Sequence, residues 1–474
     1  MVRKSLLPLL LALFFISFSF AGKPLYDIKV NIKGLKDTVC YLGNYYGDKQ
    51  YIKDTAKVDS KGQCEFKGDE ALPGGIYLII TPAKKYFEII VDKEQFFSVE
   101  TDTNNFIGKM KIKGSTDNEL FYEYLKFVDA KQLEAAPLRE QYKKIKNNKD
   151  SSKTIQDKLT AIEKDVQNYK LKYIADYPQT MLAVVFRSSQ EPEVPKAPLL
   201  PGGKKDSVFV YRYYKKHFFD NIDFNDDRIL RTPIFHAKIK QYITTLVIQM
   251  PDSIIPEADS IISKGRNNKE IFKYLVWYFT NWSETSEIMG FDAIFVHMVD
   301  KYYNANQAYW VTPANLEKIT TRAKILKNLL LGVKIPNITA QDTNNVFVTL
   351  YNVQSPFTVL YFWDPTCGHC QKETPKLKNL YDSINKKVKN VEVYAVCTDP
   401  KLQDWKKYII EHQLNWINVM DMQNTTGYHT TYDIYSTPVI YLLDKNKTIL
   451  AKRLSVEQLE EFLDREINKE KKKK

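Results

Sequence analysis

The segment that most constrains this chain is residues 359–375, where a strand-type run leads directly into a helix-type run. The strand is apolar and ends at Trp363, and the helical part is interrupted by Pro375. Cys367 and Cys370 lie between the two, separated by two residues. Two cysteines at this spacing on a strand-to-helix turn are typical of a dithiol that exchanges with disulfides. We therefore predict that this pair forms the active site.

The place of each cysteine predicts its role. Cys367 stands where the helix begins, so unpaired backbone N–H groups and the positive end of the helix dipole favour its thiolate. It is the candidate nucleophile. Cys370, one turn inside the helix, is the candidate resolving thiol, which attacks the mixed disulfide and releases the substrate. A zinc site would need a second pair of ligands. We expect no metal and no cofactor other than the redox-active Cys367–Cys370 pair itself.

The same residues carry a resemblance to a known family. Phe362 and Trp363 before Cys-Gly-His-Cys, followed by Glu373 and Pro375, resemble the thioredoxin superfamily and, more narrowly, its TlpA/ResA-like extracytoplasmic disulfide reductases. In that subgroup a glutamate three residues after the second cysteine tunes the dithiol, which implies such a role for Glu373. Thioredoxin has a buried aspartate six residues before its first cysteine. Tyr361 stands there in this chain, so the proton-acceptor role of that aspartate is not carried over.

The resemblance implies further site residues. Thr437 and Pro438 directly precede an apolar strand-type run, where the family has a cis-proline that faces the dithiol. A cis X–Pro bond lacks an N–H and turns the neighbouring backbone outward, so that an extended substrate segment can pair with it. We expect Trp363 to pack beside the dithiol and screen it from water. With His369 and Thr437, it completes the expected substrate-binding set.

His369 and Glu373 are expected to adjust the dithiol. An imidazole at position 369 should lower the pKa of Cys367 and raise the reduction potential. Glu373 can either accept the proton of Cys370 or hold a negative charge that opposes thiolate formation. The alternative for Glu373 is a helix residue that simply faces solvent.

The other three cysteines have plainer interpretations. Cys397 ends a strand-type run, and a buried packing thiol is favoured there over a third redox cysteine. Cys40 and Cys64 alternate with Leu42 and Phe66, so both should point into a core. They either form a disulfide or pack as small apolar thiols.

A chain of 474 residues should hold about three domains. The expected parts are a signal peptide, an antiparallel β-sandwich, a mostly α-helical domain and a thioredoxin-like α/β domain, at residues 1–21, 22–114, 115–332 and 333–474. The thioredoxin resemblance is specific over about residues 335–466. Upstream of it, the chain resembles two accessory domains of unknown function that precede such modules in Bacteroidetes proteins, which adds no chemistry.

Short apolar runs separated by glycine turns predict the sandwich. They cover residues 28–32, 39–42, 64–66, 76–80 and 87–91. A capping box at Thr116 opens the helical region. Helical spacing continues at residues 155–173, 235–250, 269–281, 291–303 and 312–331, and Gly332 stops the last helix.

Strand and helix alternate after Gly332, as in an α/β sandwich. The expected strands are residues 346–348, 359–362, 391–396, 439–443 and 449–450. The expected helices are the one that carries the dithiol, then residues 403–412 and 456–462.

The N-terminal sequence indicates where the protein is located, and the net charge limits the classes of binding partner. Arg3 and Lys4 precede an uncharged stretch that ends at Ala21, which predicts a signal peptide cleaved after Ala21. The alternative is a retained membrane anchor. The net charge is +12. The lysines, however, are spread along the helices and are not accompanied by a nucleic-acid recognition motif, so a nucleic-acid partner is not expected.

The leading hypothesis is an exported, periplasmic thiol–disulfide oxidoreductase that acts as a reductase. It would take electrons from a membrane electron carrier and pass them to exported protein or thiol substrates. An oxidase or isomerase is the alternative, because Cys-Gly-His-Cys also occurs in disulfide isomerases. A third hypothesis makes the upstream domains a substrate-binding or scaffold module, with the redox activity secondary.

Overall fold

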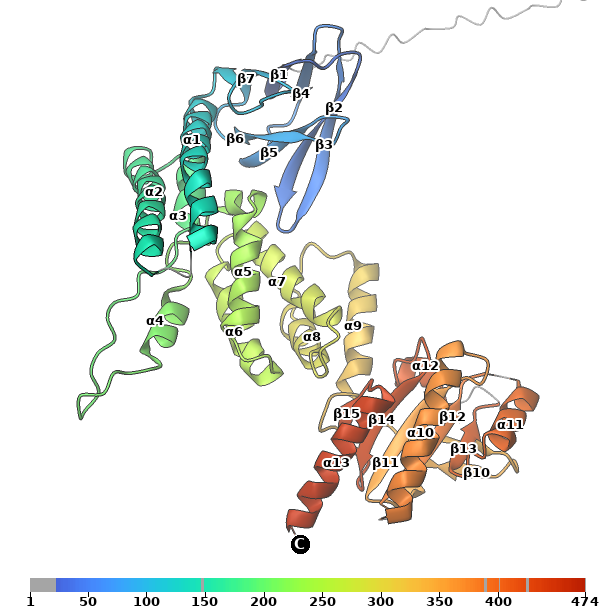
Figure 1. Ribbon diagram of the computed structural model, residues 1–474. Helices are drawn as coiled ribbons and strands as arrows, with labels where there is room; N and C mark the ends of the chain where they lie inside the picture. The colour runs from blue at the N-terminus through green and yellow to red at the C-terminus, as the bar shows by residue number, and fades with distance from the viewer. Residues whose placement is uncertain (1–22, 146–148, 388–389, 400, 423–425, 474) are drawn as a thin grey trace, which may run out of the picture. The chain divides into compact units, whose positions relative to one another are not determined.

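The computed structural model describes residues 23–145, 149–387, 390–399, 401–422 and 426–473 (Figure 1). The expected signal peptide, including Ala21, lies outside these ranges. The chain divides into two compact units, Met1–Tyr242 and Ile243–Lys474. The division falls inside the helical region that the sequence predicts as one domain, so each unit combines a sheet structure with helices of that region.

Two four-stranded sheets form the N-terminal sandwich, with strand orders β4-β1-β7-β8 and β3-β2-β5-β6. The strands are β1 (Tyr26–Lys33), β2 (Thr38–Tyr46), β3 (Lys49–Val58), β4 (Gln63–Gly68), β5 (Gly75–Ile80), β6 (Tyr86–Val91), β7 (Phe96–Asp102) and β8 (Lys111–Lys113). One neighbouring pair, β1 with β7, is parallel, and the other pairs are antiparallel. The predicted sandwich is therefore present, with one parallel pair inside it.

The sequence pattern misses β3, β7 and β8. Most of β3 is exposed, so it lacks the alternation of buried and exposed residues that marks β1 and β4. Its position is set by hydrogen bonds to β2 rather than by an apolar face of its own.

Helices follow the sandwich in the first unit. They are α1 (Thr116–Ile145), α2 (Lys149–Asp176), α3 (Met181–Ser188), α4 (Phe209–His217), the 3-10 helix η1 (Asp227–Arg231) and α5 (Ile234–Thr245), which runs across the division between the units. The predicted helix at residues 155–173 is the central part of α2. It ends two residues before Pro178, as expected from the restricted backbone before proline.

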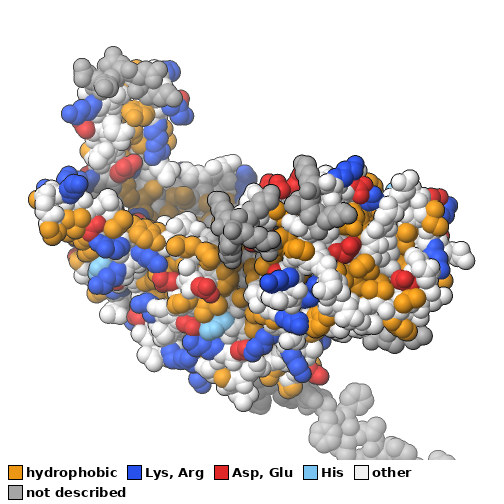
Figure 2. Space-filling model, turned by 90° about the horizontal axis from the view of Figure 1, so that it is seen from below, with side chains coloured by type: hydrophobic (Ala, Val, Ile, Leu, Met, Phe, Trp, Pro, Cys, Tyr) orange, Lys and Arg blue, Asp and Glu red, His pale blue; other side chains and the backbone are white. Residues whose placement is uncertain are grey.

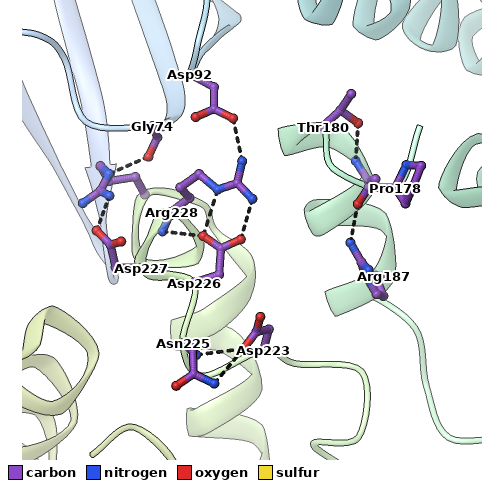
Figure 3. Close-up of polar contacts among 12 residues, drawn as sticks. Gly74, Asp92, Pro178, Thr180, Arg187, Asp223, Asn225, Asp226, Asp227 and Arg228 are labelled. Carbon is purple, nitrogen blue, oxygen red and sulfur yellow. Dashed lines mark hydrogen bonds and ion pairs between the residues drawn. The ribbon is translucent and has the colours of Figure 1, made fainter. Parts of the chain in front are cut away.

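Two arginines of η1 fasten this turn to the sandwich (Figure 3). Arg228 pairs with Asp226 on its own turn and, over 2.5 Å, with Asp92 beyond β6. Arg231 donates from Nε to the carbonyl oxygen of Gly74 over 2.6 Å and pairs with Asp227. Arg228 and Arg231 are largely buried, so these charge-assisted hydrogen bonds hold η1 against the sheet within the first unit.

The second unit begins with α6 (Pro251–Lys264), α7 (Lys269–Glu284), α8 (Asp292–Met298), the π-helical turn η2 (Val299–Tyr303) and α9 (Pro313–Lys327). The sequence pattern misses α6 because Pro256 lies inside it. The predicted helix at 312–331 begins as expected, with Thr312 as its N-cap and Pro313 in the first turn. It ends four residues early, at Lys327.

The C-terminal module is built on a seven-stranded sheet of order β10-β9-β13-β12-β11-β14-β15. Its strands are β9 (Thr339–Asp342), β10 (Phe347–Thr349), β11 (Phe357–Trp363), β12 (Val391–Cys397), β13 (Ile417–Met420), β14 (Val439–Asp444) and β15 (Ile449–Lys452). Its helical elements are η3 (Leu350–Asn352), α10 (Gly368–Lys387), α11 (Leu402–Glu411), α12 (Tyr428–Thr431) and α13 (Val456–Lys473).

The central strands β11, β12 and β13 are parallel, and β14 runs antiparallel to β11. In Figure 1, α10 and α13 lie together on one face of this sheet. A core under α10, α11 and α13 fills that face, and a second core under α12 and the segment before β11 fills the other. Every residue of β11 is therefore buried, and the strand reads as a continuous apolar run.

The outer edge of β15 is covered by the chain that enters the module. The N–H of Gly332 donates to the carbonyl of Ile449 over 2.9 Å, and the N–H of Ile449 donates to Val333 over 2.9 Å. Gly332 has a φ of 79°, a left-handed conformation that glycine adopts without steric cost. This connection protects an edge that would otherwise expose unpaired backbone groups.

Charged side chains are interspersed on the surface. On the face drawn in Figure 2, the basic groups are spread among acidic and uncharged ones, in keeping with the scattered lysines of the sequence. Within the described ranges, no helix combines the length and apolarity needed to cross a bilayer.

Candidate active site

The strand-to-helix turn is built by Asp364. Its Oδ1 accepts hydrogen bonds from the backbone N–H of Thr366 over 2.6 Å and from the Thr366 hydroxyl over 2.7 Å. Its carbonyl oxygen accepts from the N–H of Cys367 over 3.2 Å. An aspartate that binds the backbone two residues on closes a tight turn. β11 therefore stops at Trp363, and α10 starts at Gly368.

Cys367 is placed at the exposed start of α10. It is partly exposed, and its carbonyl accepts the helical hydrogen bond from the N–H of Gln371 over 3.0 Å. Burial acts to raise the pKa of the Cys367 thiol, but hydrogen bonds from the backbone N–H groups of Cys370 and His369 outweigh it, and the pKa is lowered. These N–H groups are the free donors of the first helical turn. The geometry thus favours a Cys367 thiolate.

Cys370 has the opposite environment. It is 1% exposed and packs in the core under α10. The backbone N–H of Asp364 points at its Sγ over 3.4 Å. Desolvation raises the pKa of Cys370 to about 12. Both cysteines are free thiols in the structure, one partly exposed and one buried.

The Thr437–Pro438 peptide bond is cis, as expected. The carbonyl oxygen of Thr437 lies 3.5 Å from Sγ of Cys367. The backbone immediately before β14 is therefore in contact with the candidate nucleophile, and Thr437 and Pro438 are both partly exposed. Sequence positions 367, 370, 437 and 438 come together at one edge of the module.

His369 and Trp363 differ in what they can reach. His369 is exposed, and its contribution to the pKa of Cys367 comes through its backbone N–H. Trp363 is 0% exposed, with its ring stacked on Tyr361 at 6.2 Å and packed against Tyr408 at 5.3 Å. The expectation that Trp363 packs in the dithiol region agrees with this placement. Direct contact between Trp363 and a substrate is inconsistent with this placement, because β11 is covered on both faces.

Glu373 is partly buried and lies between α10 and the start of α13. Its Oε1 accepts from Nζ of Lys376 over 2.8 Å, and its Oε2 accepts from the backbone N–H of Val456 over 3.4 Å. Lys376 also binds Glu457 over 2.8 Å. Glu373 therefore lies one turn beyond Cys370 on α10, with its carboxylate bound to Lys376 and to the start of α13.

A buried polar pair next to the dithiol has only a faint sequence signal. The hydroxyl groups of Tyr361 and Thr374 are 2.8 Å apart, and both residues are fully buried. Burial raises the pKa of Tyr361, so its phenol stays protonated. Thr374 follows Cys370 by four residues, which places both on the core face of α10. The spacing of four residues from Cys370 is the sequence feature from which the place of Thr374 beside the dithiol could have been predicted.

Cys397 ends β12 directly beside Trp363 of β11. It is buried, its Sγ lies 3.6 Å from the carbonyl of Asp399, and burial raises its pKa. These features match a packing thiol. Among residues with described positions, no group of three or more His, Cys, Asp or Glu side chains is arranged to hold a metal ion.

Three family models match separate parts of the chain. Residues 26–121 match a domain of unknown function, DUF4369, and residues 140–328 match another, DUF5106. Residues 356–449, which include the dithiol and the cis-proline, match a family described as thioredoxin-like.

Sequence relatives name the chemistry of this last part. The chain is 26% identical over 142 residues to thiol-disulfide oxidoreductase ResA of Bacillus cereus, which covers 29% of this chain and 80% of that protein. It is also 26% identical over 113 residues to ResA of Bacillus subtilis, covering 24% of this chain and 61% of that one.

Among solved structures, a domain of a possible thiol-disulfide isomerase from Cytophaga hutchinsonii is 45% identical. The match covers 31% of this chain and 97% of that domain, with a TM-score of 0.28. The family assignment rests on the family models and on sequence identity. The chain belongs to the thioredoxin-like thiol–disulfide oxidoreductases and carries DUF4369 and DUF5106 domains ahead of the redox module.

Proposed function

We propose that this protein is an exported reductase of protein disulfides, with Cys367 as nucleophile and Cys370 as resolving thiol. The observation that carries the proposal is the contrast between the two thiols. Cys367 is partly exposed at the helix start with a lowered pKa, and Cys370 is buried with a raised one. A dithiol of this kind reacts first at one defined sulfur.

In the first step, the Cys367 thiolate attacks one sulfur of a substrate disulfide. The substrate S–S bond breaks, a mixed disulfide with Cys367 forms, and the other substrate sulfur leaves as a thiolate. The Thr437 carbonyl beside Cys367 belongs to a backbone segment that is open to an extended substrate chain. We assign Thr437 and Pro438 to substrate positioning on this ground.

In the second step, Cys370 attacks Sγ of Cys367. The mixed disulfide breaks, the Cys367–Cys370 disulfide forms, and the second substrate sulfur leaves as a thiolate, so two electrons have passed to the substrate. Cys370 must lose its proton before this attack. Because its pKa is raised, the deprotonation of Cys370 is the unfavourable part of this step. We propose that Glu373, one turn along α10, adjusts this loss through its charge.

The reduced dithiol must then be restored. We propose a membrane electron carrier as the donor and exported proteins or small thiol compounds as the acceptors. The relatives named as thiol-disulfide oxidoreductases support the reaction class, and the sequence of residues 1–21 supports export. The DUF4369 and DUF5106 domains are proposed to select substrates or to hold the module in position.

A second candidate is an oxidase or isomerase, and His369 is the observation that favours it. His369 is exposed between the cysteines and its backbone N–H helps to lower the pKa of Cys367, and a dithiol with a more acidic nucleophile is more oxidising. The two candidates use the same residues and differ in reduction potential.

The decisive experiment is therefore equilibration of the mature protein with glutathione buffers of known ratio. The redox state of the Cys367–Cys370 pair is read by alkylation and mass. A potential near roughly −270 mV supports the reductase. A potential near about −120 to −180 mV replaces it with the oxidase or isomerase. A Cys367→Ser variant, which cannot form this disulfide, is the control for other thiols.

A further inference from the structure

Two cysteines outside the active site are buried in the same core of the N-terminal sandwich. Cys40 lies on β2 and Cys64 on β4, so they belong to different sheets. Their exposed fractions are 0% and 9%, and both belong to the same hydrophobic core.

The fold brings these strands together at a corner of the sandwich. β3 pairs with β2 in one sheet, and the chain then passes through the turn at residues 59–62 into β4 of the other sheet. β3 and β4 lie side by side as a result. Cys40 pairs across the β2–β3 ladder with Ala56, which is small and buried.

The two thiols occupy one core, and each affects the pKa of the other. The side chain of Cys64 lowers the pKa of Cys40, and the side chain of Cys40, together with burial, raises the pKa of Cys64. This is the pattern of an S–H group of Cys64 that donates to the sulfur of Cys40. Both are free thiols in the structure. Side-chain contact between sulfurs on facing strands is the starting geometry for a bond between them.

We propose that Cys40 and Cys64 form a disulfide that joins the two sheets when the chain folds in an oxidising compartment. The two S–H bonds are lost, one S–S bond forms, and two electrons and two protons pass to a disulfide oxidant, which leaves as two thiols. Glutathione disulfide serves as this oxidant in vitro, and a disulfide-bonded protein of the compartment serves in the cell.

The bond would act on stability rather than on catalysis. It closes the loop of residues 40–64 and ties the edge strand β4 to an inner strand of the opposite sheet. Closing a loop of this length removes conformational freedom from the unfolded chain. Because both sulfurs are buried, the folded sandwich shields the bond from the protein's own dithiol and from external thiols.

The test counts thiols in a variant without the active-site pair, Cys367→Ser with Cys370→Ser. Of the five cysteines, Cys40, Cys64 and Cys397 remain. The mature variant is unfolded, refolded in a glutathione redox buffer, and then alkylated in denaturant before and after reduction. We expect one alkylated cysteine before reduction and three after it, with peptide mapping assigning the pair to positions 40 and 64.

Three alkylated cysteines before reduction would overturn the proposal, and so would glutathione adducts at either position or a bond to Cys397. The melting temperature gives an independent readout. A sample of this variant that is unfolded and refolded in reductant should melt roughly 5 °C or more below the oxidised sample. Adding Cys40→Ala and Cys64→Ala should abolish that sensitivity to reductant. The thiol count decides the matter even if the alanine variant folds poorly.

Discussion

The sulfur of Cys367 lies 3.5 Å from the carbonyl oxygen of Thr437, although 70 residues separate the two in the chain. The contact joins the start of α10 to the backbone that precedes β14. The proposed nucleophile therefore borders the main-chain segment to which we assign the positioning of an extended substrate peptide. A substrate disulfide that enters along this segment meets Cys367 before it can meet Cys370, which is buried.

The first prediction concerns the reactivity of Cys367. Its lowered pKa means that the thiolate forms below the ordinary value of 9.0, so the midpoint of iodoacetamide alkylation against pH should lie below 9.0. Each unit of lowering gives about ten times more thiolate at neutral pH. Rapid-quench alkylation with mass readout checks this. A Cys370→Ser variant should keep the reactive thiol, and Cys367→Ser should lose it. A midpoint at or above 9.0 would contradict the proposed role of the helix N-terminus.

The second prediction separates attack from resolution. Cys370→Ser should accumulate a mixed disulfide between Cys367 and a substrate protein, because the attacking sulfur remains and the resolving one is gone. Cys367→Ser should accumulate none, since Cys370 is 1% exposed. Non-reducing gels after incubation with an oxidised test protein show the adduct. Equal trapping by both variants would show that Cys370 is more accessible than the structure indicates.

The site was predictable from sequence where its residues are close in the chain or carry a known spacing. Cys367 and Cys370 follow from the strand-to-helix pattern alone. The Thr437–Pro438 position follows only from the resemblance, because no local pattern states which distant loop faces the dithiol. That Trp363 is too deeply buried for direct substrate contact could not be predicted, because this burial depends on α11, whose Tyr408 packs on the ring. A tertiary contact of this kind leaves no periodic signal.

The elements of the fold likewise separate into those that could be predicted from local sequence and those that could not. Strands with one buried face, such as β1 and β4, were predicted from their alternation. β3, mostly exposed, was missed because pairing with β2 rather than apolar residues of its own fixes its place. The helix α6 was missed because Pro256 lowers the local helix propensity, while packing of Ile254 and Ile261 in the core offsets the loss.

The third prediction tests the charge of Glu373. Glu373→Gln should lower the pKa of Cys370 by on the order of half to one unit and raise the reduction potential, because a negative charge near the thiolate is removed. Glu457→Gln is the matched control. Both carboxylates bind Lys376 over 2.8 Å, but only Glu373 lies on the helix that carries the dithiol. Glutathione equilibration measures both variants. Equal shifts in the two would assign the effect to Lys376 instead of Glu373.

The fourth prediction concerns a buried ion pair that fastens the helices of the second unit to β15. Nζ of Lys452 pairs with Asp292 of α8 and donates to the carbonyl of Leu329, and the Lys452 and Asp292 side chains are 7% and 17% exposed. Asp292→Asn leaves a buried ammonium without its counter-charge. This should reduce the free energy of unfolding by about 3–5 kcal/mol. Asp300→Asn, which breaks the exposed pair with Lys327, should cost under about 1 kcal/mol.

The pH dependence of the Asp292→Asn variant has a defined sign. Burial lowers the pKa of Lys452 below its ordinary 10.5, and loss of Asp292, which raises it, lowers it further. Between the folded-state pKa and 10.5, the folded protein has released a proton that the unfolded chain still holds. The stability of the variant should therefore rise with pH through this window. Denaturant titrations at several pH values measure the slope. A flat profile, or one that matches Asp300→Asn, would show that the Lys452 ammonium is hydrated and that the pair does not fasten β15 to α8.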